Sequence, residues 1–146
     1  MINADDVFDV LADTTRRRML ALLMAEDELS VAELCYAIDC SQPKASRHLA
    51  KLRDARVVSV RRDRVWKHYR LHPQLPAWAF QVLQTMTHSG EQASMLGRDL
   101  NRLATMPDRP IGAEHARATP QSTNVEYLPV RAAPATPNSV TPAPTV

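Results

Sequence analysis

The apolar residues in the first third of the chain recur at the three- and four-residue spacing of amphipathic helices, and they predict four short helices. Polar residues suited to capping precede the last three of these helices, namely Asp13, Ser30 and Ser41. Ser30 is followed three residues later by Glu33, which completes a capping box. The apolar faces are, in chain order, Val7, Phe8, Leu11 and Ala12; Met19, Leu20, Leu22 and Leu23; Val31, Leu34, Cys35 and Ile38; and Ala45, Leu49 and Leu52.

After Arg56 the hydrophobic period changes to two, which is typical of β-strands. Val58 and Val60 mark a first strand, and a basic turn separates it from a second one. The second run alternates through Val65, Lys67, Tyr69 and Leu71. Beyond Pro73 and Pro76, the stretch from Trp78 to Met106 predicts one long last helix with a kink between Thr87 and Gly90.

The third and fourth helices are joined by a tight turn at Asp39-Cys40, and a cationic hairpin follows the fourth helix at once. This order is typical of a winged helix-turn-helix, in which the second helix of the pair enters the major groove of DNA. The sequence therefore predicts a mainly α fold with a small β-hairpin.

The proline content divides the 146-residue chain into two parts. Eight of the eleven prolines and only one aromatic residue, Tyr127, lie in the last forty residues, which cannot bury enough surface to offset chain entropy. We therefore expect a folded domain over residues 1–106 and a Pro-rich, disordered tail over residues 107–146. The sequence shows no apolar stretch of membrane-spanning length and no export signal, so we expect a cytoplasmic protein.

Positive charge is concentrated in one short stretch of the chain. Residues 41–72 carry ten basic and two acidic side chains, a net charge of +8, whereas residues 1–40 carry a net charge of −6. Such a stretch suits a polyanion. The three glycines stand alone, which excludes a Gly-rich phosphate loop, and no grouping of nucleophile, base and orienting residue is present, so we do not expect an enzyme.

The predicted recognition helix and wing supply the candidate DNA contacts. Side chains with donors and acceptors suited to base edges are Gln42, Ser46, Arg47 and His48. Lys44 and Lys51 can reach phosphates. The wing adds Arg61, Arg62, Arg64 and Lys67, which suit the backbone or the neighbouring minor groove.

Three segments carry a family resemblance: LADTTRRRMLALL, ELCYAIDCSQPKASRHLAKLRDARVV and VWKHYRLHPQLPAW. They resemble the ArsR/SmtB family of winged-helix repressors, particularly its arsenic-responsive branch, over about Val7 to Ala79. The resemblance implies a homodimer, built on the first and last helices, that binds double-stranded operator DNA and releases it when an inducer binds. It also implies that Gln42, Ser46 and His48 read bases.

The chain departs from this branch in its thiols and glycines. The usual C-V-C pair is replaced by Ser30 and Ala32; Cys35 matches the usual third cysteine and Cys40 is additional. Two glycines common in the family are Arg56 and Arg64 here. If the backbone keeps a positive φ at both, each costs about 1 kcal/mol.

Cys35 and Cys40 are the candidate site for a thiophilic inducer, arsenite or a related trivalent arsenical, and no resident cofactor is required. Cys35 lies on an apolar helix face, where a small buried hydrophobe is the alternative interpretation. Cys40 precedes a helix N-terminus, which favours a reactive or ligating thiolate. The two thiols can meet only if the third helix ends between them, which Asp39 allows.

Several alternatives remain open at this level. A winged-helix regulator can respond to thiol oxidation or to no ligand, and a dimeric adaptor can use the Pro-rich tail to dock a partner. His88 and Glu91 form half of a zinc site, but a chance surface pair is the better interpretation. The aromatic residues Trp66, Tyr69 and Trp78 are expected to be core or interface anchors rather than a stacking platform for single-stranded nucleic acid.

Overall fold

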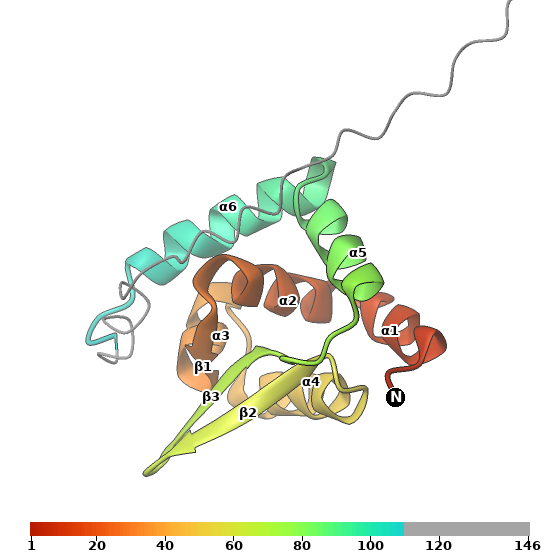
Figure 1. The fold of residues 1–146 in the computed structure, drawn as a ribbon. Helices are drawn as coiled ribbons and strands as arrows, with labels where there is room; N and C mark the ends of the chain where they lie inside the picture. Colours follow the sequence, from red (N-terminus) through yellow and green to blue (C-terminus); the bar gives the residue numbers. More distant parts are fainter. Residues whose placement is uncertain (110–146) are drawn as a thin grey trace, which may run out of the picture.

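A computed structural model describes residues 1–109, which form six helices and one three-stranded sheet (Figure 1). In chain order the elements are α1 (Ala4–Leu11), α2 (Thr14–Glu26), β1 (Glu28–Ser30), α3 (Val31–Ile38), α4 (Gln42–Asp54), β2 (Val58–Asp63), β3 (Trp66–Leu71), α5 (Ala77–Thr87) and α6 (Gly90–Ala104). Figure 1 shows α6 lying across α2 and α3 on the side away from the sheet. The mainly α winged-helix fold predicted from the sequence is confirmed.

The predicted caps start the helices where the sequence placed them. The carboxylate of Asp13 accepts the N–H of Arg16 at 3.0 Å, at the start of α2. At the start of α3, Ser30 and Glu33 form the complete capping box, with hydrogen bonds of 3.0 and 3.2 Å. Such caps stabilise a helix by roughly 1 kcal/mol each. The N-terminal ends of these two helices are thus fixed by local hydrogen bonds.

The wing contains one strand more than predicted. The order is β1-β3-β2, all antiparallel, and Leu29 of β1 lies opposite Tyr69 of β3, which lies opposite Val60 of β2. The sequence pattern predicted no strand at this position, because the strand has three residues and is too short for a periodic signal. Leu29 is fully buried, and this burial holds β1 in the sheet. The second wing strand begins at Trp66, since Val65 lies in the turn and is exposed.

The predicted long last helix is two helices, α5 and α6. His88 and Ser89 separate them, and Gly90 opens α6 with a φ of +47°. The expected kink is therefore a complete break. A positive φ is costly for most residues but not for glycine, so Gly90 permits the change of direction.

The core lies between α2, α3, α4 and the sheet. Met19, Leu20, Leu22, Leu23, Leu34, Leu49 and Leu52 are all fully or almost fully buried, as the helical spacing predicts. In α1 the buried residues are Val7, Val10 and Leu11, whereas Phe8 is 56% exposed and contacts Trp78 of α5 (ring centroids 6.4 Å apart). Phe8 was expected on the inward face and is not in the core.

The described chain continues three residues past the expected domain boundary at residue 106. Arg109 forms ion pairs with Glu33 at 2.6 Å and with Glu26 at 3.2 Å, so this residue belongs to the folded body. We expected a Pro-rich, disordered tail over residues 107–146. From residue 110 onward this expectation lies outside the residues that the structure describes. None of the helices over residues 1–109 is long and apolar enough to cross a membrane.

Candidate nucleic-acid interface and thiol site

Helix α4 presents the predicted recognition residues on its outer surface. Ser41 caps the helix by accepting the N–H of Lys44 at 3.4 Å, and Pro43 occupies the first turn. Ala45, Leu49 and Leu52 face the core with no exposed surface. Their burial fixes the rotation of the helix, so Gln42, Ser46 and Arg47 are exposed.

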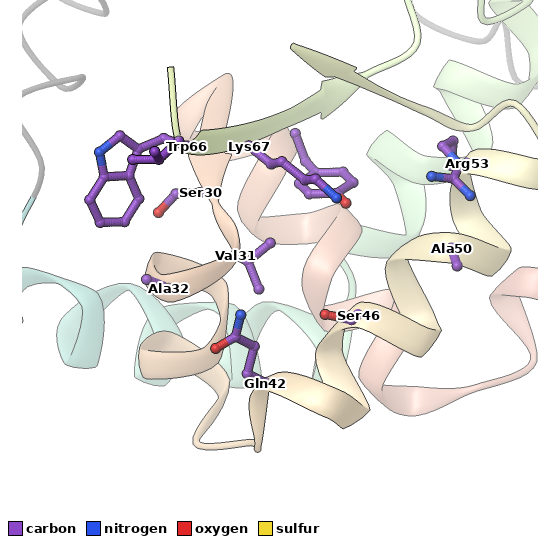
Figure 2. A pocket seen from close by; sticks show the side chains of 11 residues that line it. Ser30, Val31, Ala32, Gln42, Ser46, Ala50, Arg53, Trp66 and Lys67 are labelled. Atoms are coloured by element: carbon purple, nitrogen blue, oxygen red, sulfur yellow. The ribbon is translucent and has the colours of Figure 1, made fainter. Parts of the chain in front are cut away.

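A groove of about 400 Å³ runs between α4 and the wing. Figure 2 shows Gln42 and Ser46 on α4 facing a space whose other side is formed by Trp66 and Lys67 of β3. Arg53 lines the same groove and was not singled out from the sequence. The sequence spacing could have identified Arg53. Its spacing from the preceding residues of the face places it there, since the intervals between Gln42, Ser46, Ala50 and Arg53 are four, four and three residues.

One of the predicted cationic contacts is held in an ion pair within the fold, and a second lies near acidic residues. Arg61 lies 2.6 Å from Glu28 of β1, and its hydrogen bond lowers the pKa of that carboxyl. Lys51 lines a second hollow together with the acidic residues Asp6, Asp9 and Asp54. Among residues 1–109, ion pairs are absent for Lys44, Arg47, Arg62, Arg64 and Lys67, all of them exposed. These five side chains are available to a polyanion, and Lys51, which is also exposed and without an ion pair in this part of the chain, differs from them in lying beside acidic residues.

His48 lies against the start of α2 rather than in the groove. Its Nδ1 atom is 3.8 Å from the Asp13 carboxylate, and only 16% of its side chain is exposed. Burial lowers the pKa of His48, and the Asp13 carboxylate partly offsets this. The structure thus ties His48 to the cap of α2, and its base-reading role stays a prediction.

Two arginines occupy left-handed backbone positions that commonly hold glycine. The φ angle is 59° at Arg56 and 55° at Arg64, so the strain expected for both residues is present. At the wing tip this strain accompanies an exposed cation.

The two cysteines are brought together by the end of α3. The helix stops at Ile38, and Asp39 adopts a left-handed conformation with φ 59° and ψ 52°. The N–H of Cys40 then donates to the carbonyl oxygen of Cys35 at 3.1 Å. This helix ending folds the chain back, so the two thiols are neighbours rather than lying on opposite sides of a continuous helix.

Both cysteines are free and half-buried. Burial raises the pKa of the Cys35 thiol to about 11, and the neighbouring Cys40 thiol contributes to the rise. Cys35 therefore carries its proton at neutral pH. Over residues 1–109, no group of three or more His, Cys, Asp and Glu side chains is arranged to hold a metal ion, so the site offers two soft donors.

The turn between the cysteines is tied to helix α6. Arg18 of α2 donates to both carboxylate oxygens of Asp99, at 2.7 and 2.9 Å, and to the carbonyl oxygen of Ile38 at 3.3 Å. Arg102 of α6 lies 3.1 Å from the carboxylate of Asp39. These contacts join residues far apart in the chain, and no local sequence pattern indicates them.

The candidate zinc ligand His88 and the three aromatic residues considered from the sequence make contacts within the protein. Nδ1 of His88 lies 2.7 Å from the carbonyl oxygen of Gln84, one turn earlier in the same helix. Tyr69 belongs to the core and Trp78 packs against Phe8, as expected for anchors. Trp66 is half-exposed and lines the groove.

Comparison with known proteins identifies the family. A helix-turn-helix domain family matches residues 11–61. The arsenic resistance transcriptional regulator ArsR1 of Pseudomonas putida is 46% identical over 104 residues, which cover 71% of this chain and 80% of that protein. The chain belongs to the ArsR family of transcriptional regulators. ArsR2 of the same organism, also an arsenic resistance transcriptional regulator, is 42% identical over 76% of this chain and 95% of its own length.

The solved structure of HlyU from Vibrio cholerae superposes on this ArsR-family regulator with a TM-score of 0.51 and 28% identity, over 57% of this chain and 87% of HlyU. The protein is therefore a DNA-binding transcriptional regulator and not an enzyme, as the sequence predicted. Helix α4 and the first part of β2 lie within the matched residues, whereas the part of the groove formed by Val65, Trp66, Lys67 and Tyr69 lies beyond them.

Proposed function

We propose that this ArsR-family protein is a homodimeric repressor that releases its operator when a trivalent arsenical binds Cys35 and Cys40. The observation that carries the proposal is the meeting of the two thiols in the turn directly before the recognition helix. Two relatives named as arsenic resistance regulators support the class of inducer.

The DNA surface consists of the outer face of α4 and the wing. Gln42 and Ser46 face the groove and Arg47 is exposed beside them, so these residues meet base edges. Lys44, Arg62, Arg64 and Lys67 meet phosphates, because they are exposed and no acidic side chain within residues 1–109 forms an ion pair with them. Arg53 lines the groove and also meets phosphates, and its only acidic partner within residues 1–109 is the exposed Asp54, 3.6 Å away.

The thiol pair suits arsenic that keeps one ligand of its own. Trivalent arsenic is thiophilic and commonly takes three soft ligands, and each chain offers two. When a singly methylated arsenical with two hydroxyl groups binds, two S–As bonds form and two As–O bonds break. The two thiol protons leave with the hydroxyl groups as two water molecules. Arsenite follows the same steps and fills its third position with a hydroxyl group or a thiol of the other chain.

Binding at this position acts directly on the recognition helix. Cys40 is followed at once by Ser41, whose side chain caps the first turn of α4, where Gln42 and Lys44 lie. Drawing both sulfur atoms onto one arsenic atom shifts the backbone at Cys40 and moves this turn. The arsenical and the operator then favour different arrangements of the turn, which is the differential affinity that release requires.

The homodimer is supported by apolar surface on the first helix and on the helix after the wing. Phe8, Trp78 and Phe80 are between 38% and 56% exposed, and Phe8 and Trp78 are in contact. An exposed aromatic cluster of this kind is typical of an interface. A twofold dimer built on α1 and α5 places two recognition helices for a palindromic site.

Gel-shift titrations under reducing conditions test the proposal, with phenylarsine oxide and arsenite as inducers. Cys35→Ser and Cys40→Ser should each bind operator like the wild type and each fail to release it. Ser59→Cys, which adds a thiol on the wing, should release like the wild type. If both serine variants still release DNA, the thiols are structural and the arsenical site is wrong. Release by peroxide and not by arsenicals would instead favour a Cys35–Cys40 disulfide as the switch.

A further inference from the structure

The residues between the two cysteines are held from outside the turn by two arginines. Arg18 donates to the carbonyl oxygen of Ile38 and, with two hydrogen bonds, to Asp99 of α6. Arg102 pairs with Asp39, whose left-handed conformation folds Cys40 back toward Cys35. Asp99 and Arg102 are three residues apart and therefore lie on the same face of α6.

We infer that Arg18 and Arg102 are positioning residues of the dithiol site: anchored on α6, they hold the turn Ile38-Asp39 in the conformation that places the two thiols side by side. This inference deepens the proposed function and rests on its dithiol site, but it concerns the geometry of the thiols and not the identity of the inducer.

The two contacts differ in strength. Asp99 is only 3% exposed and accepts a two-bond contact from Arg18, which is geometrically specific and stronger than a single hydrogen bond. The Asp39 and Arg102 side chains are 82% and 48% exposed, so their pair contributes as little as surface pairs generally do. The Arg18–Asp99 contact is therefore the main anchor, and Arg102 refines the position of Asp39.

Arg18 also compensates the charge of the buried Asp99 carboxylate. An uncompensated carboxylate at Asp99 would be costly between α2, α3 and α6, and Arg18 offsets this cost while it reaches the turn. The hydroxyl of Tyr36 contacts Thr105 near the end of α6, so the same helix holds α3 at a second place. Binding at the thiols is thus linked to the seating of α6, and by reciprocity the seating of α6 affects closure of the dithiol site.

Dibromobimane is a probe of thiol spacing that contains no arsenic. Its first reaction forms one S–C bond and releases one bromide, and its second reaction does the same at the neighbouring thiol and closes a ring. The first rate depends on exposure and ionisation of a thiol, whereas the ring-closing rate also depends on how the two thiols are positioned. A purely structural role of the arginines would change the first rate and not specifically the second.

Arg102→Gln should slow ring closure about two- to fivefold, as expected for loss of an exposed pair. Asp99→Asn should slow it about tenfold or more, because a charged two-bond contact is lost. The first step should stay at its wild-type rate in both variants. Arg98→Gln is the matched control, since it removes the same charge from an exposed position on α6 and should leave both rates unchanged.

Ring closure at the wild-type rate in both variants overturns the inference. If Asp99→Asn loosens the fold and speeds the first step, Arg102→Gln decides alone, because its pair is exposed. Arg102→Lys, which keeps the charge, should recover part of the rate. The two proposals fail separately: a wild type that closes the ring but keeps its operator in the presence of arsenicals contradicts only the inducer, and normal closure in the variants contradicts only the positioning role.

Discussion

Arg109 donates from Nε to a carboxylate oxygen of Glu33 over 2.6 Å. Glu33 is 5% exposed, and its other carboxylate oxygen accepts the N–H of Ser30 in the capping box of α3. One buried carboxylate thus joins the start of α3 to the chain that follows α6. Because Arg109 also donates to Glu26, its single positive charge is shared between two carboxylates.

We predict that Arg109→Ala lowers the free energy of unfolding by about 1–3 kcal/mol, because it leaves the buried Glu33 carboxylate without its charged partner. Truncation after Met106 should cost a similar amount, whereas truncation after Arg109 should cost much less. Urea unfolding followed by circular dichroism measures the difference. Equal stability of the two truncated proteins would show that Arg109 contributes nothing.

A second prediction concerns the left-handed position that ends α4. Arg56 has a φ of 59°, which a glycine adopts without steric strain. Arg56→Gly should therefore raise the free energy of unfolding by about 1 kcal/mol. Arg53→Gly, in the helical part of α4, is the contrasting variant and should lower it by about 1 kcal/mol. A lower urea midpoint for Arg56→Gly would mean that its side chain stabilises the fold by more than the strain costs.

The elements that sequence alone predicted are those with several consecutive local signals. Helix α3 has the capping pair Ser30 and Glu33 and an apolar face, and α4 has Ser41 and Pro43 at its start. Strand β1 has three residues and no period of its own, and it exists because Leu29 is buried opposite Tyr69. Its stabilisation comes from tertiary contacts, which local patterns do not contain.

In the candidate site, too, the sequence predicted the features that depend on local patterns and not those that depend on long-range contacts. The cationic face of α4 and the wing follow from residue type and spacing, and the end of α3 at Asp39 allowed the thiols to meet. The partners of individual charges did not follow, because they depend on long-range contacts. Arg18 meets Asp99 across 81 positions and Arg61 meets Glu28 across 33. Spacing identifies a basic surface but not which of its charges are already compensated.

The pKa of Cys35 gives a third prediction. Alkylation needs the thiolate, so the rate at Cys35 should rise with pH to a midpoint near 11, the value that burial and the neighbouring Cys40 produce. In Cys40→Ser the midpoint should fall but stay above 9.0, because burial is the larger cause and remains. Mass spectrometry of iodoacetamide-treated protein, from about pH 8 to about pH 12 so that the range extends beyond the expected midpoint, measures both curves. A midpoint at 9.0 or below in the wild type would contradict the burial of this thiol.

The raised pKa of Cys35 also lowers the free energy of unfolding at high pH. Above about pH 9.0 the unfolded chain loses the Cys35 proton while the folded chain keeps it until about pH 11. The unfolded state then binds fewer protons, so stability falls as pH rises through this window. The contribution is fully present below pH 9.0, and Cys35→Ala should show a flatter decline over the same interval.

The last prediction concerns the salt dependence of operator binding. Each phosphate contact releases about one counterion, so a dimer that uses the exposed cations of α4 and the wing should lose about three orders of magnitude or more in affinity between 50 and 200 mM salt. Arg62→Gln should reduce the slope of log affinity against log salt by about one per protomer. Arg61→Gln, one residue earlier, should reduce it less, because Glu28 already holds that guanidinium at 2.6 Å.

Arg47→Ala should weaken specific binding more than non-specific binding, whereas Arg64→Ala should weaken both alike. Fluorescence anisotropy with operator and scrambled duplexes measures all four variants. A shallow wild-type slope would contradict the basic surface as a whole, and equal slopes for Arg61→Gln and Arg62→Gln would show that the pair with Glu28 opens when DNA binds.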